Sequence, residues 1–349
     1  MTAKIKDFRE ILIPHSDCGH EREYAEMMAE KLRAYTDADK VTVDPMNNVI
    51  AYIGDPDKYT IMLEAHIDEI SLIVHDITED GFLRVKNVGG VDRRTLPSSE
   101  VLVNGLPGIV CNTPPHLSTD PRKVPEYESL YIDLGLSADE VKKLVKIGDR
   151  VYSTAGIVEL QNGRVAARAH DDRICAYSIL TALKKLSTYI KNGSLDCCIA
   201  VLFATQEELG SRGAKVGAYT IDPDEALVLD VTLAAEQRVK SSLKVGEGPV
   251  IERSGYFDRQ MIRDLCNVAK EKNIKYQSDV SVRSGGTDAA AVHMTCAYVS
   301  TVLISLPLRH MHTPYEVIDI ADVESTASLM AEYIKFKFKK SAKTKKEGK

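Results

Sequence analysis

The sequence predicts an α/β protein in which a mixed, mainly parallel β-sheet has helices on both faces and is interrupted by a β-rich insertion. Toward both ends of the chain, apolar strand-like runs alternate with amphipathic helical patterns, and strands separated by helices favour parallel pairing. From residue 71 to about 167, short β-rich runs follow one another with a single helical interruption. We therefore expect a discontinuous α/β domain, residues 1–67 plus 168–349, and an inserted β-rich domain at residues 68–167.

The first part of the chain supplies a helix and three strands. Apolar residues recur at helical spacing through residues 21–35. Strand-like segments follow at residues 40–44, 47–53 and 59–68. These elements open the α/β domain.

The insertion is expected to be almost entirely β-structure. Its strand-like runs cover residues 71–77, 82–88, 100–105, 107–112 and 156–168. Asn162-Gly163 predicts a two-residue type I′ hairpin turn within the last run. Ser137 and Glu140 form a capping-box pattern, which predicts the one helix of the insertion at residues 137–145.

After Asp171 the alternation of helix and strand resumes. Helical patterns cover residues 171–190 and 258–273, and a last amphipathic helix begins near Asp322. Strand-like runs cover residues 195–205, 225–231 and 296–306. The first of these runs is apolar from Ala200 to Ala204, which is typical of a strand covered on both faces.

Composition argues against several classes of protein. A hydrophobic fraction of 44% and a charged fraction of 28% are those of a globular chain. No apolar stretch approaches the roughly 20 residues of a membrane span, and the N-terminus lacks the apolar core of a secretory signal. The net charge of −6 argues against a nucleic-acid partner. We expect a cytoplasmic protein that binds neither membrane nor nucleic acid.

The cysteines and the basic tail carry no predicted function. The seven cysteines are odd in number and form no C-x-x-C pair, which favours free thiols in a reducing compartment over a thiolate metal site. The Lys-rich tail at residues 335–349 is interpreted as a solvated terminus.

The residues that suggest chemistry gather at the ends of predicted strands. The doublet Glu207-Glu208 follows a buried strand, where open α/β sheets place their ligands. For the doublet alone, solvated glutamates at a helix N-terminus are an equally good explanation. Four other segments offer further metal-ligand types, which are His66 with Asp68, Asp171 with Asp172, Asp230, and His310 with His312.

Each of these segments has an ordinary structural explanation when taken by itself, such as helix capping or a polar turn. Together they form a set of histidines and carboxylates that suits zinc, cobalt or manganese better than calcium or magnesium. His66 and Asp68 lie two residues apart in a predicted strand, so both side chains point to the same face. We expect Asp68 to hold the ring of His66.

The same motifs resemble those of the M42 metallo-aminopeptidases, in the family's order and spacing. They are HID at 66–68, AHDDR at 169–173, QEELGSRGA at 206–214, LDV at 229–231, GGTDA at 285–289 and HTPYE at 312–316. The match covers nearly the whole chain. It implies a zinc-peptidase-like catalytic domain, and the insertion resembles the β-barrel-like dimerisation domain of that family.

The resemblance implies a role for each motif residue. Asp171 would bridge two divalent metal ions, Zn²⁺ or Co²⁺ or else Mn²⁺, and the Asp171-Asp172 peptide would be cis. The remaining ligands, one pair for each ion, would be His66 with Asp230 and Glu208 with His312. Glu207 would be the general base and acid toward a metal-bridging water, while Asp68 would orient His66. The GGTDA motif would bring Gly286, Thr287 and Asp288 to the substrate.

The resemblance also implies the substrate and the assembly. The free α-amine of a short peptide would be held at the metal centre, so that one N-terminal residue is removed at a time. Dimers would form a homo-oligomer, a tetrahedral dodecamer whose active sites face an interior cavity.

Several alternatives stay open at this point. His310 competes with His312 as a ligand, and His170 is a further candidate. Arg283 is interpreted either as a partner of an acidic substrate side chain or as half of a surface ion pair. The same site would suit dinuclear carboxypeptidases or amide deacylases, although their inserted domain lies between later strands. A glycosidase could use the two glutamates as its acids, but the histidines would then have no function. A non-enzymatic scaffold would not explain why every ligand position holds a metal-binding residue type.

Overall fold

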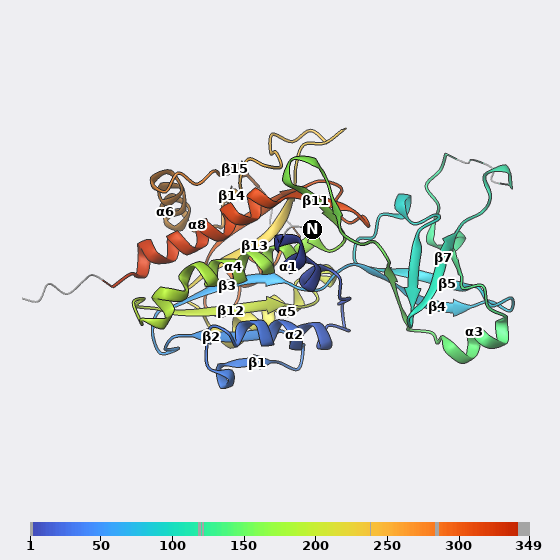
Figure 1. The fold of residues 1–349 in the computed structure, drawn as a ribbon, viewed down its shortest axis with the longest axis horizontal. Helices are drawn as coiled ribbons and strands as arrows, with labels where there is room; N and C mark the ends of the chain where they lie inside the picture. Colours follow the sequence, from blue (N-terminus) through green and yellow to red (C-terminus); the bar gives the residue numbers. More distant parts are fainter. Residues whose placement is uncertain (1–2, 118–119, 121, 238, 283–285, 341–349) are drawn as a thin grey trace, which may run out of the picture.

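The structure is a computed structural model that describes residues 3–117, 120, 122–237, 239–282 and 286–340. Its α/β part contains an eight-stranded sheet in the order β1-β2-β12-β3-β13-β16-β14-β15 (Figure 1). The strands are β1 Val41–Val43, β2 Val49–Ile53, β3 Thr60–His66, β12 Cys198–Ala204, β13 Glu225–Leu233, β14 Val250–Arg253, β15 Gln277–Val280 and β16 Ser300–Leu308. The central strands β12, β3, β13 and β16 pair in parallel, and β1, β2 and β14 add antiparallel pairings. The predicted mixed, mainly parallel sheet is confirmed.

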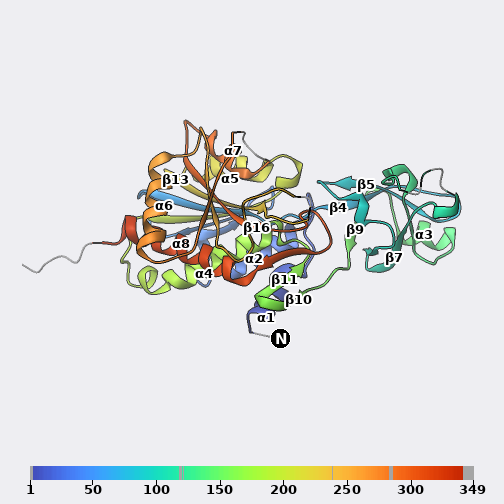
Figure 2. The same ribbon diagram turned by 90° about the horizontal axis from the view of Figure 1, so that it is seen from above.

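Helices pack on both faces of this sheet. They are α1 Ala3–Leu12, α2 Arg22–Leu32, α4 His170–Lys191, α5 Arg212–Ile221, α6 Arg259–Glu271, α7 Asp288–His293 and α8 Ile320–Phe338. The long helices α4 and α8 pack together on one face, and α5 and α7 lie on the other (Figure 2). Every residue of β3 and β12 is buried as a result, as expected for strands covered on both faces.

The insertion forms a closed barrel at one end of the molecule (Figure 1). Its strands, in the order β4-β5-β8-β7-β6-β9, are β4 Ser71–Ile77, β5 Leu83–Val88, β8 Tyr131–Asp133, β7 Leu106–Cys111, β6 Glu100–Val103 and β9 Arg150–Ser153. Its buried core is a cluster of aliphatic side chains separate from that of the sheet. The predicted helix is α3, Ala138–Leu144, and the Glu140 carboxylate accepts the Ser137 N–H at 2.9 Å.

A small third sheet connects the barrel to the α/β part. It consists of β10 Val158–Glu159, β11 Arg164–Ala167 and β17 Glu316–Asp319, and β11 pairs antiparallel with β17. β11 leads directly into α4. The chain that returns from the barrel is therefore fixed beside the end of the HTPYE motif. The division into residues 1–67 plus 168–349 and 68–167 stays a prediction.

Some local predictions were wrong in detail. The hairpin at Asn162-Gly163 exists, but its loop has three residues, 161–163, because the Leu160 N–H donates to the Arg164 carbonyl. β16 begins at Ser300 rather than near residue 296 and continues through a proline to Leu308. Seven elements were not predicted, which are α1, α7, β8, β9, β14, β15 and β17. Among the described residues, no helix has the length and apolar character that crossing a membrane requires.

Candidate metal centre

The carboxyl ends of three neighbouring strands form the floor of the site. β3 ends at His66, β12 ends just before Glu207 and Glu208, and Asp230 lies near the end of β13. Because β12, β3 and β13 pair in parallel, their carboxyl ends meet at one edge of the sheet. Residues that are far apart in the sequence are thereby brought together.

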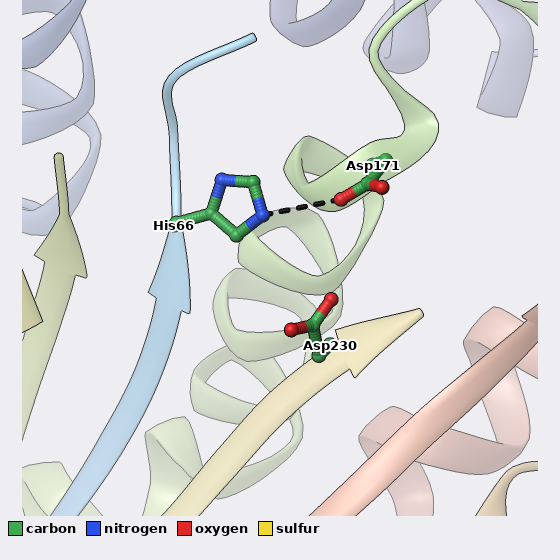
Figure 3. Close-up of side chains that lie close together, drawn as sticks. All are labelled: His66, Asp171 and Asp230. Carbon is green, nitrogen blue, oxygen red and sulfur yellow. Dashed lines mark hydrogen bonds and ion pairs between the residues drawn. The ribbon is translucent and has the colours of Figure 1, made fainter. Parts of the chain in front are cut away.

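The inner group consists of His66, Asp171 and Asp230 (Figure 3), whose candidate ligand atoms all lie within 4.8 Å of one another. His66 Nε2 lies 3.1 Å from Asp171 Oδ1. The three residues are 2%, 7% and 5% exposed. They come from β3, the start of α4 and β13, so the sheet and the helix packed on it set the geometry of this group.

The outer group consists of Asp171, Glu208 and His312, whose candidate ligand atoms also lie within 4.8 Å of one another. His312 Nε2 lies 3.3 Å from Asp171 Oδ2 and 3.5 Å from Glu208 Oε1. The side chain of His312 is 31% exposed. Asp171 thus directs one carboxylate oxygen toward His66 and the other toward His312.

The backbone around Asp171 is held by a buried glutamate, Glu316, at the start of β17. The Asp171 N–H donates to Glu316 Oε2 at 3.0 Å, and the His312 N–H donates to Glu316 Oε1 at 2.8 Å. The Asp171-Asp172 peptide is cis, as expected. Glu316 therefore fixes the main chain of two members of the outer group.

Asp68 connects the inner group to the glutamate doublet. Its Oδ1 lies 3.4 Å from His66 Nδ1, as the spacing of the two residues predicted. The same carboxylate accepts the backbone N–H groups of Glu207 at 3.0 Å and Glu208 at 3.2 Å, together with the Cys18 thiol at 2.9 Å. Burial alone would raise the pKa of Asp68, but these partners lower it. Asp68 is therefore a charged anchor for both sides of the site.

The ring of His312 contacts the barrel, whereas its main chain is held by Glu316 of β17. Its Nδ1 lies 3.0 Å from the carbonyl oxygen of Gly90, in the loop after β5. A Cβ at Gly90 would lie 2.5 Å from the same nitrogen, so a larger residue would displace the ring. Since a carbonyl accepts a hydrogen bond, Nδ1 carries a proton toward Gly90. Nε2, which faces Asp171 and Glu208, is then the ring nitrogen that could bind a metal ion.

The site holds more negative than positive charge. Burial, together with repulsion from nearby carboxylates, raises the pKa of Glu207 to about 8 and that of Glu208 to about 7. Burial and two neighbouring aspartates raise the pKa of Asp230 well above its ordinary value. The hydrogen bond to Asp171 raises the pKa of His312 to about 9. These shifts share one cause, which is acidic groups crowded together away from water.

Divalent metal ions fit this arrangement. Imidazole nitrogens and carboxylate oxygens are the donors that zinc, cobalt and manganese share. Each histidine directs its second ring nitrogen at an oxygen, of Asp68 or of Gly90, which is typical of metal-ligating histidines. A bound cation would also relieve the repulsion among the carboxylates. The described residues thus provide one candidate group for each of two ions.

The residues assigned to substrate binding lie in different surroundings. Gly286 and Thr287 line an open cavity together with Glu207 and Asp230. Asp288, the first residue of α7, is 1% exposed and does not line that cavity. Its carboxyl group is thus covered by protein instead of facing the opening.

The competing histidines lie outside both ligand groups. His310 Nδ1 lies 2.8 Å from Glu236 Oε2, and its side chain is 53% exposed. His170 is fully buried, and burial lowers its pKa to about 3. Arg283, the first glycine of GGTDA and the tail beyond residue 340 lie outside the described residues.

Sequence reasoning gave no role to Gly90, or to Glu316, although Glu316 lies in the HTPYE motif. Glu316 ends the HTPYE motif, four residues after His312, and Gly90 belongs to a glycine pair at the start of GGVDRR. Two sequence signals could have indicated these residues. For Glu316 the signal is an acid four residues after a candidate ligand, and for Gly90 it is a glycine pair outside a turn pattern. Neither signal identifies the residue that is contacted, because both contacts join segments that are far apart in the sequence.

Comparison with known proteins identifies the family. The model of the M42 glutamyl aminopeptidase family matches residues 47–329. The chain belongs to this family. It is therefore an aminopeptidase, a hydrolase, and the expectation drawn from its motifs is confirmed over the carboxypeptidase, deacylase and glycosidase alternatives.

Relatives and solved structures resemble this M42 aminopeptidase over almost their whole length. The lysyl aminopeptidase of Pyrococcus furiosus is 32% identical over 305 residues, which cover 84% of this chain and 86% of that protein. An aminopeptidase of Desulfurococcus kamchatkensis has a TM-score of 0.86 at 33% identity, covering 95% and 94% of the two chains. The TET1 peptidase of Pyrococcus horikoshii, which can assemble into a tetrahedron or a large octahedral shell, has a TM-score of 0.83 at 29% identity, covering 95% and 98%.

Proposed function

We propose that this M42 aminopeptidase removes single residues from the free N-terminus of short peptides at a centre of two divalent metal ions. The observation that carries the proposal is the shared carboxylate of Asp171, which faces His66 with one oxygen and His312 with the other. The inner group would hold one ion and the outer group the second. Zn²⁺ or Co²⁺ best suits this mixture of imidazole and carboxylate donors, with Mn²⁺ as a further candidate.

Two ions held in this way would supply Lewis acidity, lowering the pKa of an attacking water and polarising the scissile carbonyl. The protein's own part in the reaction is proton transfer. Glu207 belongs to neither ligand group, and it lines the open cavity beside Asp230. We assign it the role of accepting the proton of the attacking water and delivering it to the nitrogen of the leaving peptide.

The two members of the doublet thus have different proposed roles because only one of them is near His312. Glu208 completes the outer group, whereas Glu207 stays free to carry a proton. Asp68 supports both, since its carboxylate holds the backbone of the doublet and faces the ring of His66. We infer that Asp68 is a positioning residue.

Substrate would enter through the cavity that Gly286 and Thr287 line with Glu207. We assign these two residues to substrate contact. Asp288 is covered by protein, so we propose that any effect it has on substrate acts through its two neighbours.

The assembly is inferred from the similar TET1 peptidase, which can form a tetrahedron. We infer that this chain forms dimers through the barrel and that the dimers form a closed tetrahedral dodecamer. Sedimentation of the purified protein should then give the mass of twelve chains, and a deletion confined to the barrel should abolish that species. A wild-type protein that sediments as a monomer would exclude the assembly.

The chemistry can be tested with aminoacyl chromogenic substrates. Hydrolysis should disappear with a chelator and return with Zn²⁺ or Co²⁺. Glu207→Gln should keep two ions per chain by elemental analysis yet lose roughly 10²- to 10⁴-fold in kcat, the range for loss of a general base. Glu208→Gln is the matched control, since it should lose the outer ion together with activity. Loss of metal from the Glu207 variant, or activity on N-blocked peptides that survives chelation, would refute the proposal.

A further inference from the structure

A small cavity lies between the barrel and the α/β part. We call it the interdomain cavity. Its volume is about 70 Å³, and Asp171, Glu208 and His312 of the outer group form part of its lining. Its apolar wall consists of Ile70, Leu72, Val91, Leu96, Val101 and Val151. Most of this wall comes from the barrel, so the insertion contributes to the surroundings of the catalytic centre.

The polar groups in the wall of this cavity already have partners. Ser71 donates to Asp17, and the Ser99 hydroxyl donates to the Thr95 carbonyl. The hydroxyls of Thr95 and Thr313 likewise donate to backbone carbonyls. A carboxylate or another hydrogen-bond acceptor would therefore lose its water without gaining donors from these hydroxyls, which costs free energy.

The charged residues of the wall neutralise one another. Glu69 and Arg168 form a buried ion pair, and the second oxygen of Glu69 lies 2.9 Å from Arg173. Glu316 also lines the cavity, and its carboxylate already accepts the N–H groups of Asp171 and His312. Apart from its metal-binding end, the cavity suits an uncharged aliphatic group.

The size of the cavity narrows the choice further. An apolar cavity of about 150 Å³ admits benzene, and the interdomain cavity has less than half of that volume. A side chain of the size of valine or leucine matches it better than an aromatic ring does.

The cavity continues outward instead of ending blind. Thr95, Ser99, Ser153, Thr313 and Pro314 line it and also line a neighbouring groove. That groove reaches exposed residues of both parts of the molecule, among them Tyr315. The first residue of a substrate has no chain before it, whereas the second residue must be followed by the rest of the peptide. A cavity with an outlet is therefore suited to the second residue.

We propose that the interdomain cavity binds the side chain of the second substrate residue, the one whose nitrogen leaves, and selects small aliphatic groups there. The rest of the peptide then follows the groove. This inference rests on the proposed function, because it places the scissile bond at the outer group. It makes the barrel a determinant of specificity as well as a structural insertion.

The test uses tripeptides Ala-Xaa-Ala with the metal-loaded enzyme, measuring release of the first alanine. The value of kcat/KM with valine or leucine at Xaa should exceed that with glycine by tenfold or more, since a methylene in an apolar pocket changes rates about 10- to 200-fold. Aspartate and lysine should be as poor as glycine. The series Xaa-Ala-Ala distinguishes the positions, because its profile should not respond to changes in the cavity wall.

Two variants should change the preference for the second residue in opposite directions. Damage to the fold would not produce opposite changes. Val91→Phe fills the cavity and should bring the leucine-to-glycine ratio close to one. Leu96→Ala enlarges it and should raise phenylalanine relative to leucine. Ile109→Phe, on the outer side of the barrel, is the control and should leave both ratios unchanged.

A flat profile at Xaa with chelator-sensitive activity would overturn the cavity proposal alone. A Val91 effect confined to the first-position series would also overturn it. Activity that resists chelation would instead refute the proposed function, whatever the profile at Xaa.

Discussion

The inner and outer groups share Asp171 but differ in what holds them. His66 and Asp230 of the inner group are almost fully buried at the ends of parallel strands, whereas His312 of the outer group is 31% exposed and contacts the barrel. The sheet thus holds two residues of the inner group, whereas the position of the His312 ring in the outer group depends on a contact between the two parts of the molecule. We expect the outer ion to be the more easily lost.

The largest expected effect comes from the residue that the two groups share. Asp171→Ala removes the proposed ligand that the two groups share, so both ions should be lost and activity should fall to background. Elemental analysis after gel filtration measures the stoichiometry. Retention of one tightly bound ion would show that the two groups do not depend on a common carboxylate.

A pair of histidine variants separates the two groups. His312→Ala should leave one ion per chain and a normal unfolding transition, because the residue is partly exposed on a loop. His66→Ala should lose the inner ion and also unfold at lower denaturant concentration, since it opens a hole in a fully buried strand end. Equal effects of the two variants on stability would contradict the difference between the groups.

Glu316 offers a subtler way to weaken the outer group. Glu316→Gln leaves an amide that accepts from only one of the two N–H groups, Asp171 or His312, that the carboxylate holds. Affinity for the outer ion should fall roughly 10- to 100-fold, the usual effect of losing a partner behind the ligands. Competition with a chromophoric chelator measures the two affinities. Glu332→Gln, on the partly buried side of α8, is a matched control.

The smallest effect on metal binding is expected from a change at Glu69, in the wall of the interdomain cavity, which should alter acid stability instead. Glu69 is buried, and although burial alone would raise its pKa, Arg168 and Arg173 hold that pKa well below its ordinary value. Its contribution to stability is therefore fully present above about pH 4.3, the ordinary pKa of glutamate, and is lost as the pH falls toward the lower pKa of the folded state.

Urea unfolding of the metal-free protein measures this contribution. Glu69→Gln leaves buried arginine charges without their partner, so it should be less stable by about 3–5 kcal/mol at pH 7. The difference between wild type and variant should shrink as the pH is lowered below about 4. A difference that stays constant down to pH 3 would mean that the carboxylate charge contributes nothing.

Much of the site could be predicted because its residues follow strand ends. His66, Glu207, Glu208 and Asp230 each come after a buried apolar run, and parallel pairing brings such ends to one edge. The spacing of His66 and Asp68 likewise fixed which face they share. The end of each strand can be located from the sequence, because the apolar run stops there.

The rest could not be predicted because it depends on contacts between segments. The carbonyl of Gly90 meets His312 only once the barrel has docked, and Glu316 meets Asp171 only through the pairing of β17 with β11. No local sequence pattern predicts either of these two contacts. Short strands such as β14 and β15 also lack a long enough apolar run to stand out from loops.

The most direct test of the central claim is anomalous scattering from a crystal of the protein loaded with Zn²⁺ or Co²⁺. We expect one ion on each side of Asp171, one bound by His66 and Asp230 and the other by Glu208 and His312. Glu207 should touch neither ion. A single ion, an ion bound by Glu207, or an ion bound by His310 in place of His312 would contradict it.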